Sequence, residues 1–376
     1  MIDLQESRRK IDRIDEQITA LFEERMAICQ DVAEYKIQTG KEVLDTQREK
    51  EKLTALKTKA HTPFNQHGIE ELFQQIMAVS RKRQYQLMTE HGIGGGYDYE
   101  MTETLPKKGK KVVFQGVEGA YSYAAMKRYF GEQNDSFHVE TWKDAIEAVL
   151  EEKADYAVLP IENSTAGIVE DNYDLLAQHP VYIVGEQIIP CEHVLLGLPD
   201  AEIEEISRVY SHPQALAQCR KYLDEHPQWK QIKVENTAVA AKKIQEEKDC
   251  TSAAIASKEA AQFYGLKILK DKIYHNTQNS TRFIIISKHP VYEKKAERIS
   301  ICFELPHKTG SLYNMLSHII YNGLNMTRIQ SRPIVGRNWE YRFFLDFDGN
   351  LEKSAVKNAL RGIKQEANML RILGNY

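Results

Sequence analysis

Residues 11–36 read IDRIDEQITALFEERMAICQDVAEYK, and this stretch decides the fold of the N-terminal segment. Its apolar side chains recur with the alternating three-and-four spacing of a heptad seam. The seam consists of Ile11, Ile14, Ile18, Leu21, Ile28, Val32 and Tyr35. One core position of that register holds Arg25, and a buried charge costs several kcal/mol unless something pairs with it. On this residue alone, a functional cation and an arginine that snorkels or pairs with a neighbouring glutamate are both open interpretations.

The first ninety residues predict three helices, at 5–38, 46–60 and 66–90. Asp45 suits the N-cap of the second helix, while Gly40 and the stretch 63–68 interrupt the pattern. The first helix is longer than the other two, so neither can cover its seam along the whole length. We therefore expect a second copy of the chain to pack against it.

The whole chain has 376 residues and a net charge of −4. This length suits two or three domains with their own cores, and the charge argues against a nucleic-acid or membrane-surface partner. Five scattered cysteines without paired spacing indicate free thiols in a reducing compartment, rather than disulfides or a metal site. There is no apolar leader and no uncharged apolar run of membrane length. We expect a cytoplasmic protein without metal or other cofactor.

Composition divides the chain into blocks at 1–90, 91–110, 111–290 and 297–376. The second block has linker composition, and its glycines at 92–96 indicate a hinge, because no strand precedes them as a dinucleotide loop requires. In the third block, short apolar runs alternate with amphipathic helices, which predicts an α/β fold with largely parallel strands and room for two lobes around a cleft. The last block predicts the order strand, helix, strand, strand, helix, strand of a ferredoxin-like α+β unit.

Eight polar residues of the helical block have a spacing that resembles the all-helical class of chorismate mutase, over residues 5–88. The resemblance implies an interlocked dimer of three-helix chains in which the neighbouring chain donates Arg8. At ~100° per residue, Lys36 lies within about 20° of Arg25 on the first helix, whereas Arg8 points about 100° away, which agrees with that donation. The implied roles place Arg8, Arg25 and Arg48 on the carboxylates of chorismate, Lys36 and Gln84 on its ether oxygen, and Glu49, Asp45 and Ser80 at the ring hydroxyl and its support, with Lys36, Arg25, Gln84 and Glu49 as the catalytic set. Because the Claisen rearrangement to prephenate is intramolecular, such a site needs only to hold the compact conformer and to place cations where charge develops.

Three segments of the α/β block place polar groups at strand ends, where ligands of such sheets bind. They are Gly116–Ser122 (GVEGAYS), Pro160–Gly167 (PIENSTAG) and Asn279–Phe283 (NSTRF). Each segment by itself also fits an ordinary turn or loop. Together with Tyr210–Gln214 (YSHPQ), they resemble prephenate dehydratase over residues 111–288.

That resemblance implies two lobes like those of periplasmic binding proteins, which close over prephenate as it loses its ring carboxylate and its hydroxyl to give phenylpyruvate. Thr281 is the expected donor to the departing hydroxyl, and Arg282 is expected to hold carboxylate charge. The remaining substrate-binding residues are Glu162, Asn163, Ser164, Thr165, Gln214 and Phe283. A histidine beside proline in a turn, His212, is interpreted as structural, with a role as an acid as the alternative.

In the last block, Thr309–Leu312 (TGSL) and Gln330–Pro333 (QSRP) resemble the ACT regulatory domain. The implied effector is phenylalanine, whose carboxylate backbone N–H groups at a helix start can hold. The allosteric set is Gly310, Ser311, Leu312, Gln330, Ser331, Arg332 and Pro333. Ser311 and Gln330 depart from the alanine and glutamate usual in that family. A domain that only dimerises is the alternative.

The leading hypothesis is a bifunctional enzyme of phenylalanine biosynthesis that acts on chorismate and prephenate, is feedback-inhibited by phenylalanine, and forms a homo-oligomer, dimer or tetramer. Two alternatives are an arogenate dehydratase activity in the second domain and a non-catalytic protein that senses amino acids. The eight polar positions and Thr281 favour an enzyme, because a sensor needs no cations placed on a breaking bond.

Overall fold

The computed structural model describes residues 3–93 and 97–376. The chain forms two compact units, Met1–Tyr97 with Ile301–Ile372 (unit 1) and Asp98–Ser300 with Leu373–Tyr376 (unit 2). The glycine hinge expected at 92–96 falls partly on 94–96, outside the described residues. Within the predicted linker, β1 (Glu100–Thr102) pairs in parallel with β13 (Val291–Glu293), so part of that segment is a strand rather than free chain.

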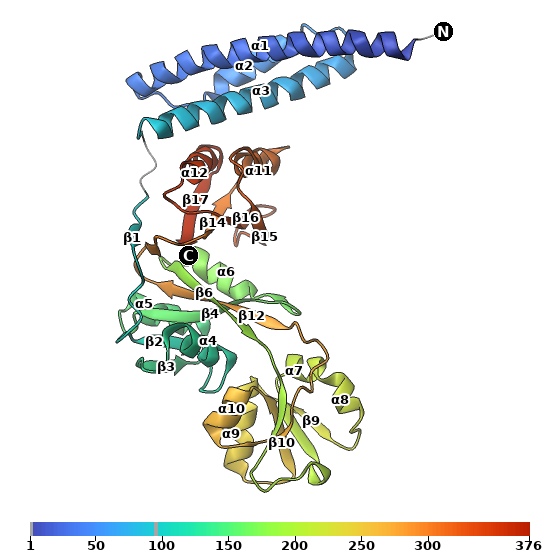
Figure 1. The fold of residues 1–376 in the computed structure, drawn as a ribbon, viewed down its shortest axis with the longest axis vertical. Coiled ribbons are helices and arrows are strands. Elements are labelled where there is room, and N and C mark those ends of the chain that lie inside the picture. The colour runs from blue at the N-terminus through green and yellow to red at the C-terminus, as the bar shows by residue number, and fades with distance from the viewer. Residues whose placement is uncertain (1–2, 94–96) are drawn as a thin grey trace. The chain divides into compact units, whose positions relative to one another are not determined.

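Three helices form the N-terminal part of unit 1: α1 (Leu4–Thr39), α2 (Thr46–Lys57) and α3 (Pro63–Glu90) (Figure 1). The predicted N-cap is present, since the Asp45 side chain accepts a hydrogen bond from the Arg48 backbone N–H. The third helix begins earlier than predicted, because Thr62 caps it and Pro63 occupies its first turn, where a missing N–H costs nothing. The helix α1 ends at Gly40, whose φ of +68° favours glycine.

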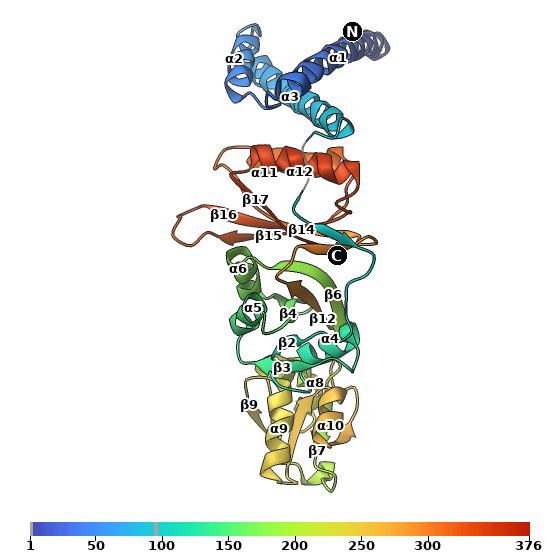
Figure 2. The same ribbon diagram turned by 90° about the vertical axis from the view of Figure 1, so that its left-hand side faces the viewer.

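The C-terminal part of unit 1 has the predicted element order. Its elements are β14 (Arg298–Glu304), α11 (Ser311–Tyr321), β15 (Met326–Pro333), β16 (Tyr341–Asp348), α12 (Ser354–Glu366) and β17 (Met369–Asn375). The strand order β15-β16-β14-β17 is that of a ferredoxin-like sheet, and α11 and α12 cover one face of it (Figure 2). The helix α12 also packs against α3.

Unit 2 consists of two lobes, each built on a sheet. The first lobe has strand order β6-β12-β4-β2-β3, with β5 beside β4. Its elements are β2 (Val112–Gln115), α4 (Tyr121–Phe130), β3 (Ser136–Val139), α5 (Trp142–Leu150), β4 (Tyr156–Asn163), β5 (Gly167–Ile168), α6 (Glu170–Gln178), β6 (Tyr182–Pro190) and β12 (Ser280–Ser287). Buried side chains such as Phe114, Val158 and Ile285 form its core.

The second lobe is inserted between β6 and β12 and has strand order β11-β7-β10-β8-β9. Its elements are β7 (Val194–Gly197), a 3-10 turn (Ile203–Glu205), β8 (Arg208–Ser211), α7 (Pro213–Gln218), α8 (Arg220–Asp224), β9 (Lys230–Lys233), α9 (Thr237–Glu247), β10 (Ser252–Ala256), α10 (Lys258–Tyr264) and β11 (Lys267–Lys270). Apolar clusters cover both faces of this sheet, as its continuous apolar strands predict.

The expectation of largely parallel strands is wrong for both lobes. The chain leaves the first lobe along β6 and returns along β12, so these two strands run antiparallel, and β12 is also antiparallel to β4. In the second lobe, β7 is antiparallel to β10 and β11. An insertion between two strands that lie side by side requires this reversal of direction.

Two candidate active sites

The Arg25 guanidinium is half-buried in unit 1, where α1 faces α3. It donates a hydrogen bond to the Ser80 hydroxyl and lies 3.8 Å from Cys29 Sγ. The Ser80 hydroxyl in turn donates to the Ile76 backbone carbonyl at 2.8 Å. The charge at the centre of the heptad register is therefore paired with polar groups of α3 rather than with a neighbouring glutamate of α1.

Lys36 lies near the end of α1, close to the loop that leads into α2. Its Nζ donates to the Val43 backbone carbonyl at 2.7 Å. Burial lowers the pKa of Lys36, against the opposing effect of Asp45. The side chain of Arg48, from the first turn of α2, is exposed.

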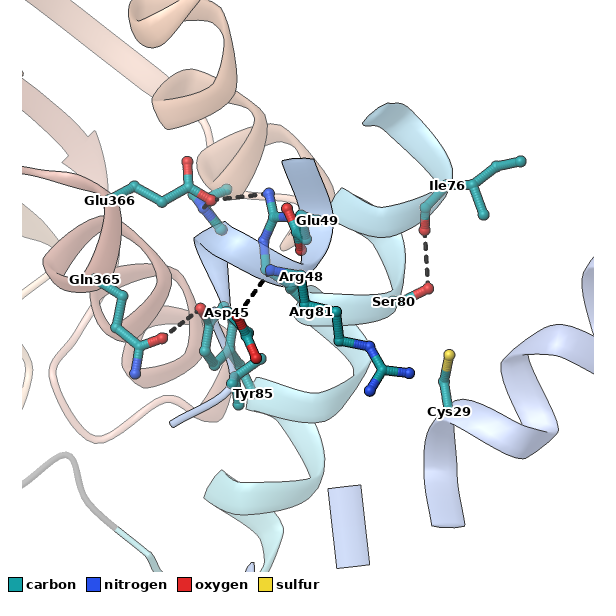
Figure 3. A network of polar contacts seen from close by, with 12 residues as sticks. Cys29, Asp45, Arg48, Glu49, Ile76, Ser80, Arg81, Tyr85, Gln365 and Glu366 are labelled. Carbon is teal, nitrogen blue, oxygen red and sulfur yellow. Dashed lines mark hydrogen bonds and ion pairs between the residues drawn. The ribbon is translucent and has the colours of Figure 1, made fainter. Parts of the chain in front are cut away.

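Glu49 is held by a residue that the sequence interpretation missed. Both Oε atoms of Glu49 accept hydrogen bonds from Arg81 Nη1, at 2.6 and 2.7 Å. Figure 3 shows Glu49 and Arg81 together with their neighbours. Arg81 is 8% exposed. Burial opposes its charge, but Glu49 and Glu366 outweigh burial and raise the pKa of Arg81. Gln84, one turn after Ser80, is also buried, and its Oε1 has no hydrogen-bond partner among the described residues.

Arg8 is the one predicted mutase residue that this chain places far from the others, in the described part of α1. It is exposed and lies seventeen residues before Arg25, roughly 25 Å along a helix with a rise of about 1.5 Å per residue. The seam on the same helix is uncovered, because each of its seven apolar side chains is at least 41% exposed. In a single chain, both the apolar seam and Arg8 are therefore exposed to solvent.

A cavity of about 470 Å³ lies between the two lobes of unit 2 and brings together three of the predicted segments and the turn at 210–214. Its polar lining includes Ser122, Asn163, His212, Gln214 and Thr281. Residues at the starts of α4, α7 and α9 also line it, so the N-termini of these helices border this space.

Asn163 organises the polar groups of the cavity. Its Oδ1 accepts from the backbone N–H groups of Thr165 and Ala166, both at 3.0 Å. Its Nδ2 must then donate, and it lies 2.9 Å from Thr281 Oγ1. Thr281 accepts this bond, so its own hydroxyl can act as a donor. Gln214 Nε2 is 3.4 Å from Asn163 Oδ1, a weaker contact.

A second chain of hydrogen bonds reaches the cavity through His193 and Gln218, neither of which was a predicted site residue. His193 lies 2.9 Å from the Tyr121 hydroxyl through Nδ1 and 2.7 Å from Gln218 Oε1 through Nε2. Gln218 Nε2 donates to Thr165 Oγ1 at 2.9 Å. Its Oε1 is therefore an acceptor, so His193 donates from Nε2 and accepts from Tyr121 at Nδ1. Burial lowers the pKa of His193, which favours this neutral form.

Cys191 is the other missed residue, because its sequence position indicated only a free thiol. Its Sγ lies 3.1 Å from Thr281 Oγ1. Burial raises the pKa of the Cys191 thiol, so it remains protonated at neutral pH. His212 caps α7, since its Nδ1 accepts from the Gln214 N–H, and it also lines the cavity.

Arg282 and Glu162, two of the predicted substrate-binding residues, do not line this cavity. Arg282 is next to Thr281 on β12, and consecutive side chains of a strand point to opposite faces. Its register partner is Glu162, and its guanidinium lies 3.8 Å from that carboxylate and 3.6 Å from Glu186. Ser164 is exposed and bonds the backbone of Ser280 and Gln278, so it closes the loop rather than lining the cavity. Phe283 does line it.

In the C-terminal part of unit 1, a cavity of about 610 Å³ lies beside the start of α11. Thr309, Ser311 and Leu312 line it, and Gly310 has the positive φ of +80° that the turn into the helix requires. The second predicted segment, Gln330–Pro333, lies on β15 at the edge of the sheet and is not part of this cavity. The two segments therefore do not form one site within a single chain.

Among residues 3–93 and 97–376, no group of three or more His, Cys, Asp or Glu side chains is arranged to hold a metal ion. Within the same residues, none of the helices has both the length and the apolar character that a membrane crossing requires.

Comparison with known proteins assigns both parts of the chain. Residues 7–85 match the chorismate mutase type II family, and residues 112–291 match the prephenate dehydratase family. The crystal structure of a prephenate dehydratase from Arthrobacter aurescens in complex with L-Phe is 31% identical, with a TM-score of 0.66 over 71% of this chain and 89% of that one. The structure of GqqA, a quorum quenching acylase, is 32% identical, with a TM-score of 0.65 over 70% of this chain and 97% of that one.

One relative spans both matched segments. The bifunctional chorismate mutase/prephenate dehydratase of Escherichia coli K12 is 32% identical over 377 aligned residues, which cover 98% of this chain and 95% of the relative. The helical segment and the two-lobed unit thus occur together, in the same order, in one protein. The chain belongs to the bifunctional chorismate mutase/prephenate dehydratase family.

Proposed function

We propose that this chain rearranges chorismate to prephenate in its helical segment and converts prephenate to phenylpyruvate in the cavity of unit 2. The observation that carries the proposal is that one polypeptide contains two separate polar sites. In unit 2, Asn163 orients the Thr281 hydroxyl, and in unit 1 the cations Arg25 and Lys36 are held by hydrogen bonds. We further propose the domain boundaries 1–90, 111–290 and 297–376. The direct test is an assay for phenylpyruvate with chorismate or prephenate as the substrate. Formation of phenylpyruvate from prephenate but not from chorismate would refute the proposed mutase activity.

The mutase reaction needs no proton transfer, so the helical site acts by shape and charge. Arg25 and Arg48 bind the two carboxylates, and this holds the substrate in the compact conformer that rearranges. Lys36 and Gln84 face the ether oxygen, where negative charge develops as the C–O bond breaks.

The mutase site is proposed to be completed by Arg8 of a second copy packed on the exposed seam. Seven exposed apolar side chains in heptad register are the signature of a helix that buries this face against another helix. A symmetric pair of chains would then contain two sites, each with Arg8 from one chain and the remaining residues from the other.

Mixing two inactive variants tests this donation. Arg8→Ala and Lys36→Ala chains should each lack mutase activity, but co-refolded mixtures should recover about a quarter of it, because half the dimers are mixed and each mixed dimer has one intact site. Mutase activity of the mixture is measured against each variant alone and against a mixture of two Lys36→Ala preparations. No recovery would place Arg8 in the same chain's site, or outside the site.

In the dehydratase cavity, hydroxide is a poor leaving group and must be protonated or strongly hydrogen-bonded as it departs. Thr281 supplies this hydrogen bond, since it accepts from Asn163 and can donate its own hydroxyl proton to the departing oxygen. Because Arg282 does not line this cavity, the carboxylates of prephenate are proposed to bind at the N-termini of α4 and α9, whose N–H groups and dipoles favour anions. Loss of carbon dioxide and aromatisation then drive the reaction.

The thiol beside Thr281 does not suit nucleophilic acyl transfer, because burial raises its pKa. Arogenate, which differs from prephenate by an amino group on the side chain, is a closer alternative substrate. Comparing kcat/KM for the two compounds distinguishes them.

We also propose that the C-terminal segment is an ACT regulatory domain that binds phenylalanine. The cavity beside α11 offers a helix start with Gly310 and Ser311, and the Arthrobacter dehydratase was crystallised with L-Phe. Added phenylalanine is expected to lower dehydratase activity, measured as phenylpyruvate formed from prephenate, with tyrosine as a control. A response to phenylalanine no larger than that to tyrosine would favour a domain that only dimerises.

A further inference from the structure

Arg81 lies on α3 between the mutase cluster and the C-terminal part of unit 1. One guanidinium nitrogen, Nη1, donates to both oxygens of Glu49, and the other, Nη2, lies 3.1 Å from Glu366 Oε1 on α12. The Arg81 side chain is only 10% exposed, and those of Glu49 and Glu366 are 26% and 14% exposed. Figure 3 shows the three side chains approaching one another from α2, α3 and α12.

Glu366 is itself fixed within the C-terminal part. His318 Nε2 of α11 lies 3.1 Å from the same Oε1, and the imidazole is almost completely buried. The ring fits because position 362, one turn before Glu366, is glycine: a Cβ there would lie 2.3 Å from His318 Nδ1. The Glu366 carboxylate therefore has a defined place on α12 and is not a mobile surface group.

Further contacts join α3 to α11 and α12 after Arg81. The Tyr85 hydroxyl donates to Gln365 Oε1 at 2.6 Å, and Arg361 donates to the Tyr85 backbone carbonyl at 3.1 Å. Lys82 lies 5.1 Å from the centre of the Tyr321 ring. Consecutive basic residues of a helix are usually exposed to water, yet both Arg81 and Lys82 are buried. This face of α3 is thus built to meet the C-terminal part.

The chemistry of arginine suits a residue that must hold two carboxylates at once. Its planar guanidinium presents several donors in a fixed fork, whereas an ammonium is a single point of charge on a flexible stem. A carboxylate that acts on substrate needs such support, because a displacement of about 1 Å in a reacting group can cost on the order of 100-fold in rate.

We propose that Arg81 is a positioning residue of the mutase reaction, which fixes the Glu49 carboxylate and is itself held by Glu366 of α12. The inference rests on the proposed mutase function of the helical segment. It makes the C-terminal part a structural component of the mutase site, although none of its residues needs to touch the substrate.

The test uses the full chain with the variants Arg81→Met, Arg81→Lys and Glu366→Gln. The matched control is Arg83→Met, because Arg83 lies on the same helix and has only a long, 3.8 Å pairing with Glu90. Arg81→Met is expected to lower mutase kcat by about 10- to 100-fold with KM for chorismate changed less than about threefold, since Glu49 loses its orientation and not its charge. Arg81→Lys should recover part of the loss, and Glu366→Gln should show a smaller loss, about two- to fivefold. Dehydratase activity reports whether unit 2 of each variant is folded, and helical content measured by circular dichroism reports on unit 1.

A double-mutant cycle separates positioning from general structural support. If Arg81 acts through Glu49, Arg81→Met should lower kcat no further when introduced into Glu49→Gln, and Glu366→Gln should have no effect in Arg81→Met. Additive losses, or a kcat of Arg81→Met equal to that of Arg83→Met, would overturn the proposal. Should Arg81→Met lose both activities, the same cycle with Arg81→Lys decides. A wild-type chain without mutase turnover would instead refute the proposed function.

Discussion

Replacing Lys36 by alanine is expected to lower mutase kcat by about 100- to 1,000-fold, the usual effect of removing one donor that stabilises charge in a transition state. The Lys36 ammonium is held near Val43 by a 2.7 Å hydrogen bond and is partly desolvated, as the burial-induced lowering of its pKa indicates. A charge removed from bulk water acts more strongly on the developing ether oxygen. The measurement is the disappearance of chorismate under saturating substrate, because the loss should appear in kcat rather than in KM.

The control for Lys36→Ala is Lys41→Ala. Lys41 is an exposed lysine five residues later, which lies over the Tyr35 ring and has no proposed contact with substrate. It should retain mutase activity, and both variants should convert prephenate at the normal rate. A kcat for Lys36→Ala within about threefold of the control would show that another group stabilises the breaking bond.

Thr281→Ala is expected to lower dehydratase kcat by about 100- to 10,000-fold, the range for the loss of a group that assists proton transfer. The variant removes the hydroxyl that accepts from Asn163 Nδ2 and leaves the surrounding strand unchanged. Formation of phenylpyruvate from prephenate measures the effect. Mutase turnover of the same preparation should be normal, since the helical site is built from other residues.

Two further variants make the Thr281 result specific. Ser280→Ala removes the neighbouring hydroxyl of the same strand and should be close to wild type. Thr281→Ser retains a hydroxyl and should recover most of the activity. Equal losses of mutase and dehydratase activity in Thr281→Ala would indicate misfolding and contradict the assignment of a chemical role.

The sequence was most informative where a single element determines which side chains meet. The 100° step per residue of a helix placed Arg25 and Lys36 on one face of α1 without knowledge of any other element, and Asp45 was identified as a helix cap from its local context. In β12, strand alternation gives an equally local constraint. Thr281 and Arg282 are consecutive in a strand, so only one of them could face the cavity.

The partners of Arg81, His193 and Cys191 could not be predicted from the sequence, because they come from distant segments of the chain. Arg81 and Glu366 are 285 residues apart, and no periodicity within α3 indicates that a charged run will be covered by another helix. His193 likewise has its partner Tyr121 in the first lobe, 72 residues earlier, and Cys191 acquires Thr281 only when the chain returns through β12. The antiparallel direction of β12 follows from that same insertion, which composition did not reveal.

The exposed seam of α1 links the amount of protein to the balance between the two activities. If two chains must associate to cover these apolar side chains, dilution separates them by mass action and removes the mutase sites. The cavity between the lobes is lined by residues of one chain, so dilution does not take any of these residues away. At low abundance the polypeptide would thus consume prephenate faster than it makes it, whereas at high abundance supply and use would be matched.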